Sequence, residues 1–259
     1  MLKGNLFIGT SGYSFPDWKG VVYPKGLPQN RWLEHYAGHF NLLELNVSYY
    51  RQPAPATIER LVNLTPPDFR VVIKAHQSIS HGGEVEPAAS ELIRRTEPLG
   101  QADKHLGFLV QFPYSFRNDK SNRYYLTVLK RSFQGYPLYF EFRHDGWLTE
   151  GVKELLEQLE VSWVNADLPE LQGLPQLTDW TTSNRAYLRL HGRNRKSWWP
   201  GTPGERYDYN YSREELQALM PALSRMDTSA EETLIFFNNC HAGQAVKNAL
   251  LLRELMEEL

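Results

Sequence analysis

The chain has little that would tie it to an oxidising compartment, a membrane or a polyanion. Cys240 is the single cysteine among 259 residues, so no disulfide can form within the chain, which is typical of a reducing compartment. The formal net charge of −2 gives no overall field that would attract nucleic acid or an anionic membrane. No apolar run approaches the roughly 18–20 residues of a membrane span, and the N-terminus lacks a signal-peptide pattern. The sequence therefore predicts a cytoplasmic protein with no membrane partner.

Several motifs that identify cofactor or metal enzymes are also missing. No Gly-x-Gly-x-x-Gly follows the first predicted strand, where Gly9 and Gly12 have a different spacing, and there is no His-Glu-x-x-His. Metal ligands can still come from separate strands without a local motif. Residues of ligand type at or just beyond predicted strand ends are His76, His191, His241, Glu141 and Asp167. The sequence leaves both a metal and a cofactor unassigned.

Short β-rich runs alternate with helical patterns about eight times. The predicted strands are 6–10, 42–48, 70–75, 107–112, 138–142, 161–166, 186–191 and 233–238. The predicted helices are 29–40, 56–64, 88–99, 122–133, 149–159, 212–226 and 242–259, while 168–184 is expected to hold only a short turn. This alternation indicates parallel strands with right-handed crossovers. We predict an α/β fold, a single-domain (β/α)8 TIM barrel over residues 1–259 with a long loop after strand seven.

Charged or amide side chains stand in pairs near the ends of five predicted strands. The pairs are Glu44/Asn46, Lys74/His76, Glu141/Arg143, Asn165/Asp167 and Arg189/His191. Strand side chains alternate with a period of two, so both members of a pair point the same way. A buried charge costs several kcal/mol unless it is paired, and TIM barrels build their active sites at these strand ends. One shared polar pocket is predicted; an ion-pair network that only fixes strand register is the alternative.

These pairs suggest chemical roles. The predicted catalytic set is Glu44, Lys74, Glu141, Arg143, Asp167, Arg189 and His191. Its carboxylates suit general acid or base catalysis, and its arginines, together with Arg193, suit bidentate binding of phosphate or carboxylate. Lys74 suits proton transfer, or Schiff-base formation if it is desolvated.

The loop over residues 192–211 interleaves basic and aromatic side chains. It contains Arg193, Arg195, Lys196 and Arg206 together with Trp198, Trp199, Tyr207, Tyr209 and Tyr211. Such a mixture suits an anionic ligand that also stacks, and loops seven and eight are the usual phosphate site of barrels. We expect an anion between Arg189 or Arg193 and the start of the last helix. The predicted ligand-binding set is Asn46, Tyr49, His76, Arg193, Trp198, Tyr209, Asn238, Asn239 and His241. The alternative is that the aromatics only pack the loop and Asn239 caps the helix.

Several segments in order along the chain carry a resemblance to a known family. They are Ile8-Gly9-Thr10-Ser11-Gly12-Tyr13, Trp18-Lys19-Gly20, Glu141-Phe142-Arg143-His144, Tyr187-Leu188-Arg189-Leu190-His191-Gly192-Arg193 and Phe237-Asn238-Asn239. Together they resemble the YecE-like family, also called domain of unknown function seventy-two. The resemblance implies a TIM-barrel fold, in agreement with the strand count, and it implies no particular reaction.

Three functions remain open on the sequence alone. The first is an enzyme, a hydrolase or lyase, acting on a phosphate-bearing ligand such as a nucleotide, a nucleic acid or a sugar phosphate. The second is a metal-free acid/base or Schiff-base enzyme that uses Lys74 on a small carbonyl compound or sugar. The third is a non-catalytic protein that binds a metabolite. Because fold does not fix function, the side chains of the pocket have to decide among them.

Overall fold

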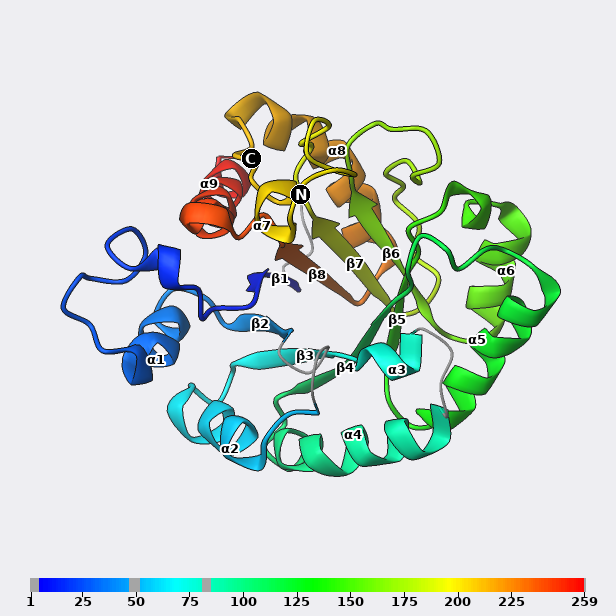
Figure 1. Cartoon of the computed structure of the whole chain (residues 1–259), viewed down its shortest axis with the longest axis horizontal. Helices are drawn as coiled ribbons and strands as arrows, with labels where there is room; N and C mark the ends of the chain where they lie inside the picture. The colour runs from blue at the N-terminus through cyan, green and yellow to red at the C-terminus, as the bar shows by residue number, and fades with distance from the viewer. Residues whose placement is uncertain (1–4, 47–51, 81–84, 259) are drawn as a thin grey trace.

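The protein is an eight-stranded parallel barrel surrounded by helices (Figure 1). The computed structural model describes residues 5–46, 52–80 and 85–258. The strands are β1 (Leu6–Ser11), β2 (Leu42–Leu45), β3 (Arg70–Lys74), β4 (His105–Gln111), β5 (Leu138–Glu141), β6 (Ser162–Asp167), β7 (Arg185–Leu190) and β8 (Glu232–Phe237). Each strand pairs with the next, and β8 closes the sheet against β1. The predicted TIM barrel is confirmed.

Helices cover the outer face of the barrel and connect its strands. The α-helices are α1 (Trp32–Ala37), α2 (Pro55–Leu64), α3 (Gln77–Ser80), α4 (Val85–Gln101), α5 (Lys120–Ser132), α6 (Glu150–Gln158), α7 (Pro203–Arg206), α8 (Arg213–Ser229) and α9 (Gln244–Glu257). Short 3-10 turns are η1 (Pro16–Trp18), η2 (Gln29–Arg31), η4 (Asp145–Trp147) and η5 (His241–Gly243). Residues 168–184 contain no helix, as expected from their composition. None of the described helices is long and apolar enough to span a membrane.

The inside of the barrel is filled by one apolar layer. It consists of Leu42, Val72, Leu106, Leu109, Tyr139, Val164, Tyr187, Leu234 and Phe236, with Phe7 packed against it. Because side chains two residues apart share a face, the next inward positions follow directly from this layer. They are Glu44, Lys74, Gln111, Glu141, Ala166, Arg189 and Asn238. A polar layer therefore lies on an apolar floor at the C-terminal ends of the strands.

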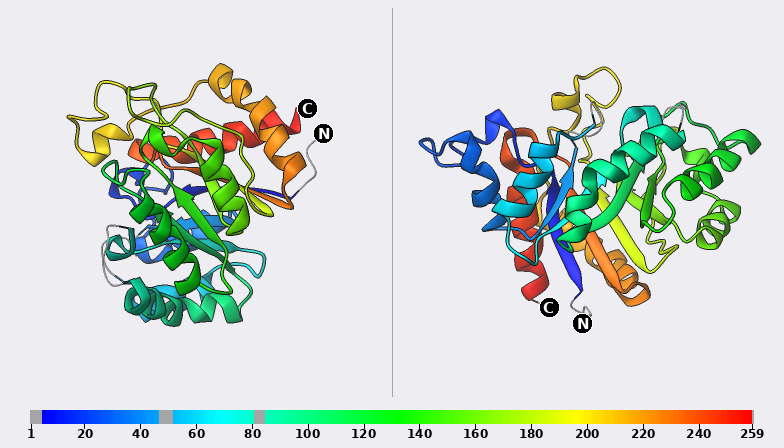
Figure 2. Two further views of the ribbon diagram at one scale, coloured as in Figure 1. Left: turned by 90° about the vertical axis from the view of Figure 1, so that its right-hand side faces the viewer. Right: turned by 90° about the horizontal axis from the view of Figure 1, so that it is seen from below.

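The loop that follows β7 lies at this same end of the barrel. Figure 2 shows the segment around α7 projecting from one end, with the C-terminal end of α9 at the other. Gly192 starts the loop with φ of 88°, and a Cβ there would lie 2.5 Å from Cβ of Tyr209. A side chain at this position would meet both a strained backbone and a clash. Glycine thus allows the chain to leave β7 and turn toward the barrel mouth.

The loop ends in a capped helix start. Oγ of Ser212 accepts a hydrogen bond from the backbone N–H of Glu215 at 3.2 Å, and Oε2 of Glu215 accepts from the backbone N–H of Ser212 at 2.9 Å. This reciprocal pair is a capping box, which satisfies two N–H groups that a helix start leaves without partners. It fixes where α8 begins and therefore where the loop after β7 ends.

We expect His105, the first residue of β4, to make the fold sensitive to acid. Its ring packs edge-on against Phe108 and Tyr136, and burial lowers its pKa from 6.5 to about 4. Between these two values the unfolded chain binds a proton that the folded chain does not. Stability is therefore lost as the pH falls from 6.5 toward 4, by up to about 1.4 kcal/mol per pH unit.

The variant His105→Phe keeps a flat ring in this position and removes the proton. We expect its free energy of unfolding, measured in urea at pH 7 and at pH 4.5, to fall less than that of the wild type. An equal fall in both proteins would contradict a lowered pKa at His105.

Candidate functional site

Arg189 on β7 is the centre of the polar layer. Its side chain is buried, and it contacts two carboxylates that are buried as well. Nε and Nη2 donate to Oε2 and Oε1 of Glu44 at 2.9 and 2.6 Å, and Nη1 donates to Oε2 of Glu141 at 2.8 Å. Tyr187 adds a hydrogen bond to Oε2 of Glu44 at 2.7 Å. The bidentate geometry compensates for the removal of these charges from water.

A second arginine completes the charge balance of the layer. Nε of Arg143 lies 2.5 Å from Oε1 of Glu141, an ion-pair contact without hydrogen-bond geometry. Burial by itself would raise the pKa of Glu141, but Arg143 and Arg189 outweigh it and hold that pKa well below 4.5. Two carboxylates and two guanidinium groups therefore face one another, as in the ion-pair network considered as the alternative to a functional pocket.

His191 is neutral within this network. Its Nδ1 lies 2.9 Å from the amide nitrogen of Asn238, which can only donate, and the carbonyl oxygen of that amide accepts from Arg189 at 3.4 Å. Its Nε2 lies 3.1 Å from Oε1 of Glu141 and 3.4 Å from both Nη1 of Arg189 and Nη2 of Arg143. Burial, together with Arg143, lowers the pKa of His191 well below 6.5.

Gln111 at the end of β4 joins the cations of the layer. Its Oε1 accepts from Nζ of Lys74 at 3.1 Å, from Nη1 of Arg189 at 3.0 Å and from Nη2 of Arg143 at 3.2 Å. Gln111 is a site residue that was not predicted from the sequence. The sequence signal was only that Gln111 is polar near the end of the predicted strand 107–112; its inward direction is seen in the structure, where it follows Leu109 by two residues and pairs in register with Glu141.

Lys74 at the end of β3 is the titratable amine of the site. Burial lowers its pKa from 10.5 to about 7, and the positive charge of Arg189 acts in the same direction. Glu44 and Glu141 oppose this effect, but each of them also contacts an arginine. At neutral pH a substantial fraction of Lys74 therefore carries a lone pair instead of a proton, which is the state that attacks a carbonyl carbon.

A cavity of about 500 Å³ opens above Lys74. Its described walls are Ser11, Phe15, Asp17, Asn46, Lys74, Gln111, Gly204, Arg206, Tyr207, Asn238, Cys240 and His241. These residues come from the ends of β1, β2, β3, β4 and β8 and from the loop after β7. The volume falls in the range of about 300–1,000 Å³ that is usual for small-molecule sites.

The predicted pair on β6 does not join this site. Val164 and Ala166 face the barrel interior, so Asn165 and Asp167 face the opposite side of the strand. Asn165 donates to the carbonyl oxygen of Trp180 at 2.9 Å and so holds the segment between β6 and β7. The expectation of one pocket shared by all five pairs is wrong for this pair, because the side chains of Asn165 and Asp167 point away from the barrel interior.

Where an anion was expected beside Arg193, the arginine forms ion pairs with side chains of this chain. Nε and Nη2 of Arg193 donate to Oδ2 and Oδ1 of Asp167 at 3.0 and 2.9 Å, and Glu215 lies 3.5 Å from Nη1. Tyr211 also donates to Oδ2 of Asp167 at 2.5 Å. Near the start of the last helix, the backbone N–H of Ala242 donates to the carboxylate of Asp17 at 2.6 Å. Both arginines expected to bind an external anion, and the N–H group of Ala242, therefore already bind carboxylates of this chain.

Other predicted ligand-binding residues have structural contacts. The amide nitrogen of Asn239 donates to the carbonyl oxygen of Tyr209 at 2.7 Å and to Asn248 at 2.8 Å. The hydroxyl of Tyr209 donates to Glu215. Nδ1 of His76 accepts from the backbone N–H of Ser78 at 3.2 Å, at the beginning of α3. None of these three predicted residues is among the described walls of the cavity.

Trp198 and Tyr49 complete the predicted set. Trp198 is buried, and the guanidinium carbons of Arg143 and Arg206 lie 5.6 and 5.7 Å from its ring centre. It therefore supports two arginines of the site without lining the cavity itself. Tyr49 lies outside the described residues. Of the predicted ligand-binding set, Asn46, Asn238 and His241 do line the cavity.

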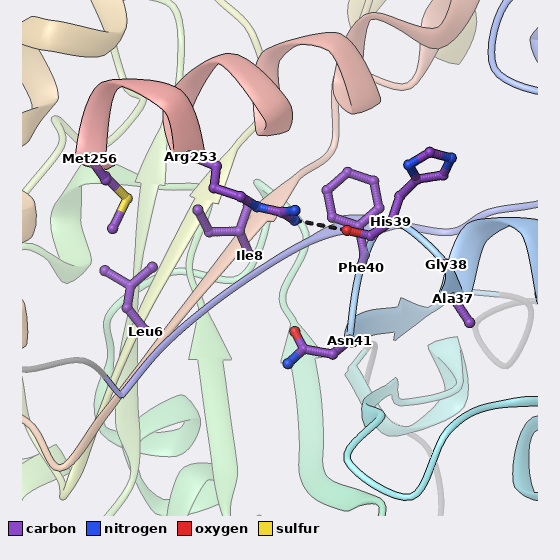
Figure 3. A pocket seen from close by; sticks show the side chains of 9 residues that line it. All are labelled: Leu6, Ile8, Ala37, Gly38, His39, Phe40, Asn41, Arg253 and Met256. Atoms are coloured by element: carbon purple, nitrogen blue, oxygen red, sulfur yellow. Dashed lines mark hydrogen bonds between the residues drawn. The ribbon is translucent and has the colours of Figure 1, made fainter. Parts of the chain in front are cut away.

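A further cavity, of about 390 Å³, lies away from this polar layer (Figure 3). It is lined by Leu6, Ile8, Ala37, Gly38, His39, Phe40, Asn41, Arg253 and Met256. Leu6 begins β1 and Asn41 directly precedes β2, so this cavity is at the N-terminal end of the barrel. Its arginine donates to the carbonyl oxygen of His39 at 2.9 Å. This end of a TIM barrel contributes to stability, whereas active sites lie at the other end.

The described residues contain no group of three or more histidine, cysteine, aspartate or glutamate side chains placed to hold a metal ion. Cys240 lines the cavity, but burial raises the pKa of its thiol, which keeps the sulfur protonated at neutral pH. Lys74 is the amine among the described walls of the cavity.

Comparison with known proteins agrees with this architecture. The profile of the family described as "Protein of unknown function DUF72" matches residues 7–259. The chain belongs to the DUF72 family. This confirms the resemblance seen in the sequence, and the family description itself names no substrate or reaction for this DUF72 barrel.

Relatives of the DUF72 chain match over almost its whole length. The UPF0759 protein YunF of Bacillus subtilis is 27% identical over 270 residues, which cover 97% of this chain and 95% of YunF. A solved DUF72 protein of Thermotoga maritima is 38% identical, covers 97% of this chain and 99% of its own, and superposes with a TM-score of 0.91. A DUF72 protein of Enterococcus faecalis is 27% identical with a TM-score of 0.87, covering 97% and 95% of the two chains.

Proposed function

We propose that this protein is an enzyme that binds a small carbonyl compound above the polar layer and uses Lys74 as its amine nucleophile. The observation that carries this proposal is the position of Lys74, which lines the cavity and shares the acceptor Oε1 of Gln111 with Arg189 and Arg143. A neighbouring cation and removal from water are the two ways in which proteins keep a catalytic lysine neutral. The lowered pKa of about 7 agrees with this geometry.

The reaction with a carbonyl compound balances without a further reagent. The lone pair of Nζ attacks the carbonyl carbon, a C–N bond forms, and a proton moves from nitrogen to oxygen to give a carbinolamine. Loss of that hydroxyl as water gives an imine, which a proton converts to an iminium ion. The iminium withdraws electrons from the adjacent carbon and so assists proton loss or carbon–carbon cleavage there. Both fall within acid/base or lyase chemistry.

The ion pairs below the cavity fit a supporting role in this proposal. Glu44, Glu141, Arg143 and Arg189 bind one another, which leaves the floor of the cavity rigid and its net charge small. A fixed set of ion pairs holds the amine in place and does not have to reorganise during the reaction. Neutral His191 lies beside Glu141 within the same layer.

Borohydride trapping tests the proposal. Protein incubated with dihydroxyacetone and sodium borohydride at pH 7.5 gains a covalent adduct if an iminium forms, because hydride reduces the iminium carbon to a stable secondary amine. We expect peptide mass spectrometry to place the adduct on Lys74, with labelling at least tenfold faster than at exposed lysines. Lys74→Arg keeps a long basic side chain but has no amine nucleophile, and it is expected to abolish this fast labelling. Labelling of Lys74 no faster than exposed lysines would reject the proposal.

The neighbouring amide gives a second prediction. Gln111→Glu places a carboxylate where three cations meet, so it favours the charged ammonium of Lys74. We expect the pKa of Lys74 to rise by about one to two units and its labelling at pH 7 to become correspondingly slower. Gln158→Glu, the same substitution at an exposed position on α6, is the matched control and is expected to change neither. Unchanged labelling in Gln111→Glu would contradict the contact between Gln111 and Lys74.

A further inference from the structure

Arg206 differs from the other arginines near the cavity. Arg143, Arg189 and Arg193 each form ion pairs with carboxylates. Within residues 5–46, 52–80 and 85–258, no carboxylate forms an ion pair with Arg206, and its Nε is buried without a hydrogen-bond partner. A buried guanidinium nitrogen without an acceptor is costly, which indicates that a partner is supplied from elsewhere.

The loop around Arg206 is built to hold this side chain in place. Its guanidinium carbon lies 5.7 Å from the ring centre of the buried Trp198. The backbone N–H of Arg206 donates to the carbonyl oxygen of Thr202 at 2.9 Å. The amide of Asn194 donates to the carbonyl oxygens of Glu205 and Asp208 at 2.9 and 3.1 Å, on either side of Arg206. The cation is therefore presented to the cavity by a fixed turn.

Two more polar atoms without partners line the same cavity. Oγ of Ser11, on a residue that is 1% exposed, and Oδ1 of Asn46 are both buried and have no hydrogen-bond partner in the described part of the chain. The amide nitrogen of Asn46 donates to the carbonyl oxygen of Ser11 at 3.3 Å, which directs Oδ1 away from that carbonyl. An amide oxygen only accepts, so it requires a donor such as a ligand hydroxyl.

We infer that the ligand is a hydroxylated carbonyl compound with an anionic group, phosphate or carboxylate, that Arg206 binds. The inference rests on the proposed function, since the carbonyl is assigned to Lys74. Arg206 takes the anion, and Ser11 and Asn46 take hydroxyl groups. Asp17 lines the same cavity, but its carboxylate is held by the backbone N–H of Ala242. Sugar phosphates and hydroxylated 2-oxo acids are the two classes that satisfy all of these groups.

Three related probes test this inference by borohydride trapping on Lys74. Dihydroxyacetone is neutral, dihydroxyacetone phosphate adds a phosphate, and hydroxypyruvate replaces one hydroxymethyl group by a carboxylate. We expect at least one of the two anions to give half-maximal labelling at a concentration at least tenfold lower than dihydroxyacetone. The better anion identifies the class. Inorganic phosphate is expected to compete with it.

Matched variants assign the effect to Arg206. In Arg206→Met the ratio of the half-maximal concentration of dihydroxyacetone to that of the better anion is expected to fall from at least tenfold to about one. Arg195→Met removes an exposed cation of the same loop and is expected to keep the full advantage.

The outcomes separate the two proposals. Equal labelling of wild-type Lys74 by all three probes would overturn the anionic ligand and leave the reactive amine standing. An anion preference that survives in Arg206→Met would overturn the role of Arg206. Absence of fast labelling of Lys74 by every probe would remove the proposed function, and the inference with it.

Discussion

Replacement of Arg189 by methionine is expected to lower the free energy of unfolding by about 3–5 kcal/mol. The side chain of Arg189 is 1% exposed and lies between Glu44 and Glu141, whose side chains are fully buried. Methionine fills a similar volume but leaves Glu44 without its bidentate partner. A buried charge that loses its partner is far more costly than an absent ion pair. Urea unfolding at pH 7 measures the difference directly.

Arg185 on the same strand provides the matched control. It pairs with Glu232, and the two side chains are 21% and 28% exposed. Because water screens this pair, we expect Arg185→Met to cost about 1 kcal/mol or less. Adding Glu44→Gln to Arg189→Met removes the orphaned charge and is expected to restore part of the loss. Equal effects of the two arginine variants would contradict the buried network.

Replacement of Lys74 by methionine is expected to raise the free energy of unfolding at neutral pH, whereas replacement of Arg189 lowers it. A pKa lowered from 10.5 to about 7 means that the fold disfavours the charged amine, by about 4–5 kcal/mol when it is fully protonated. Since Lys74 borders the cavity and retains some contact with solvent, we expect about half of this value to be gained. The gain should be largest below pH 7, where Lys74 is charged in both states.

The sign of the pH dependence follows from proton binding. Between pH 7 and pH 10.5 the unfolded chain holds a proton on Lys74 that the folded chain has released, so wild-type stability rises with pH in this window. Lys74→Met should lack this rise. Burial lowers the pKa of Lys104 as well, but its contacts differ, because Nζ donates to the carbonyl oxygens of Val62 and Thr65 at 2.9 and 2.7 Å. Lys104→Met leaves these acceptors unsatisfied and should destabilise. A destabilised Lys74→Met protein would contradict the unfavourable burial of charge.

The sequence predicted the barrel well because its strands and helices differ in period and length. The predicted strand at 138–142 ends one residue beyond the observed Leu138–Glu141, and the helix at 122–133 corresponds to Lys120–Ser132. The last helix was expected from residue 242 but begins at Gln244. Ala242 and Gly243 have left-handed φ values of 49° and 75°, which no periodicity of apolar residues reveals.

The phase of each strand was harder to predict than its position. In a TIM barrel both faces of a strand are buried, so apolar residues do not alternate with polar ones and do not mark the inward side. Glu44, Glu141 and Arg189 were predicted to face one shared pocket, and in the structure their side chains do face one another inside the barrel. On β6 the pair Asn165 and Asp167 was predicted to face the same pocket, although Ala166 is the inward residue.

The partners of the loop cations could not be predicted from the sequence. Arg193 and Arg206 both lie among aromatic residues in the loop after β7. In the folded chain Arg193 meets Asp167 from a different strand, whereas Arg206 reaches the cavity wall. Which arginine receives an internal carboxylate depends on the path of the loop, which is set by contacts such as those of Asn194.

The most direct test of this account is the pKa of Lys74 itself. Reductive methylation with ¹³C-formaldehyde gives each lysine a methyl signal whose chemical shift follows its protonation, and the signal missing in Lys74→Arg assigns Lys74. We expect this signal to titrate near pH 7, while exposed lysines titrate near 10.4. A Lys74 signal that titrates with the exposed lysines would show an ordinary charged ammonium and would contradict the proposed amine nucleophile.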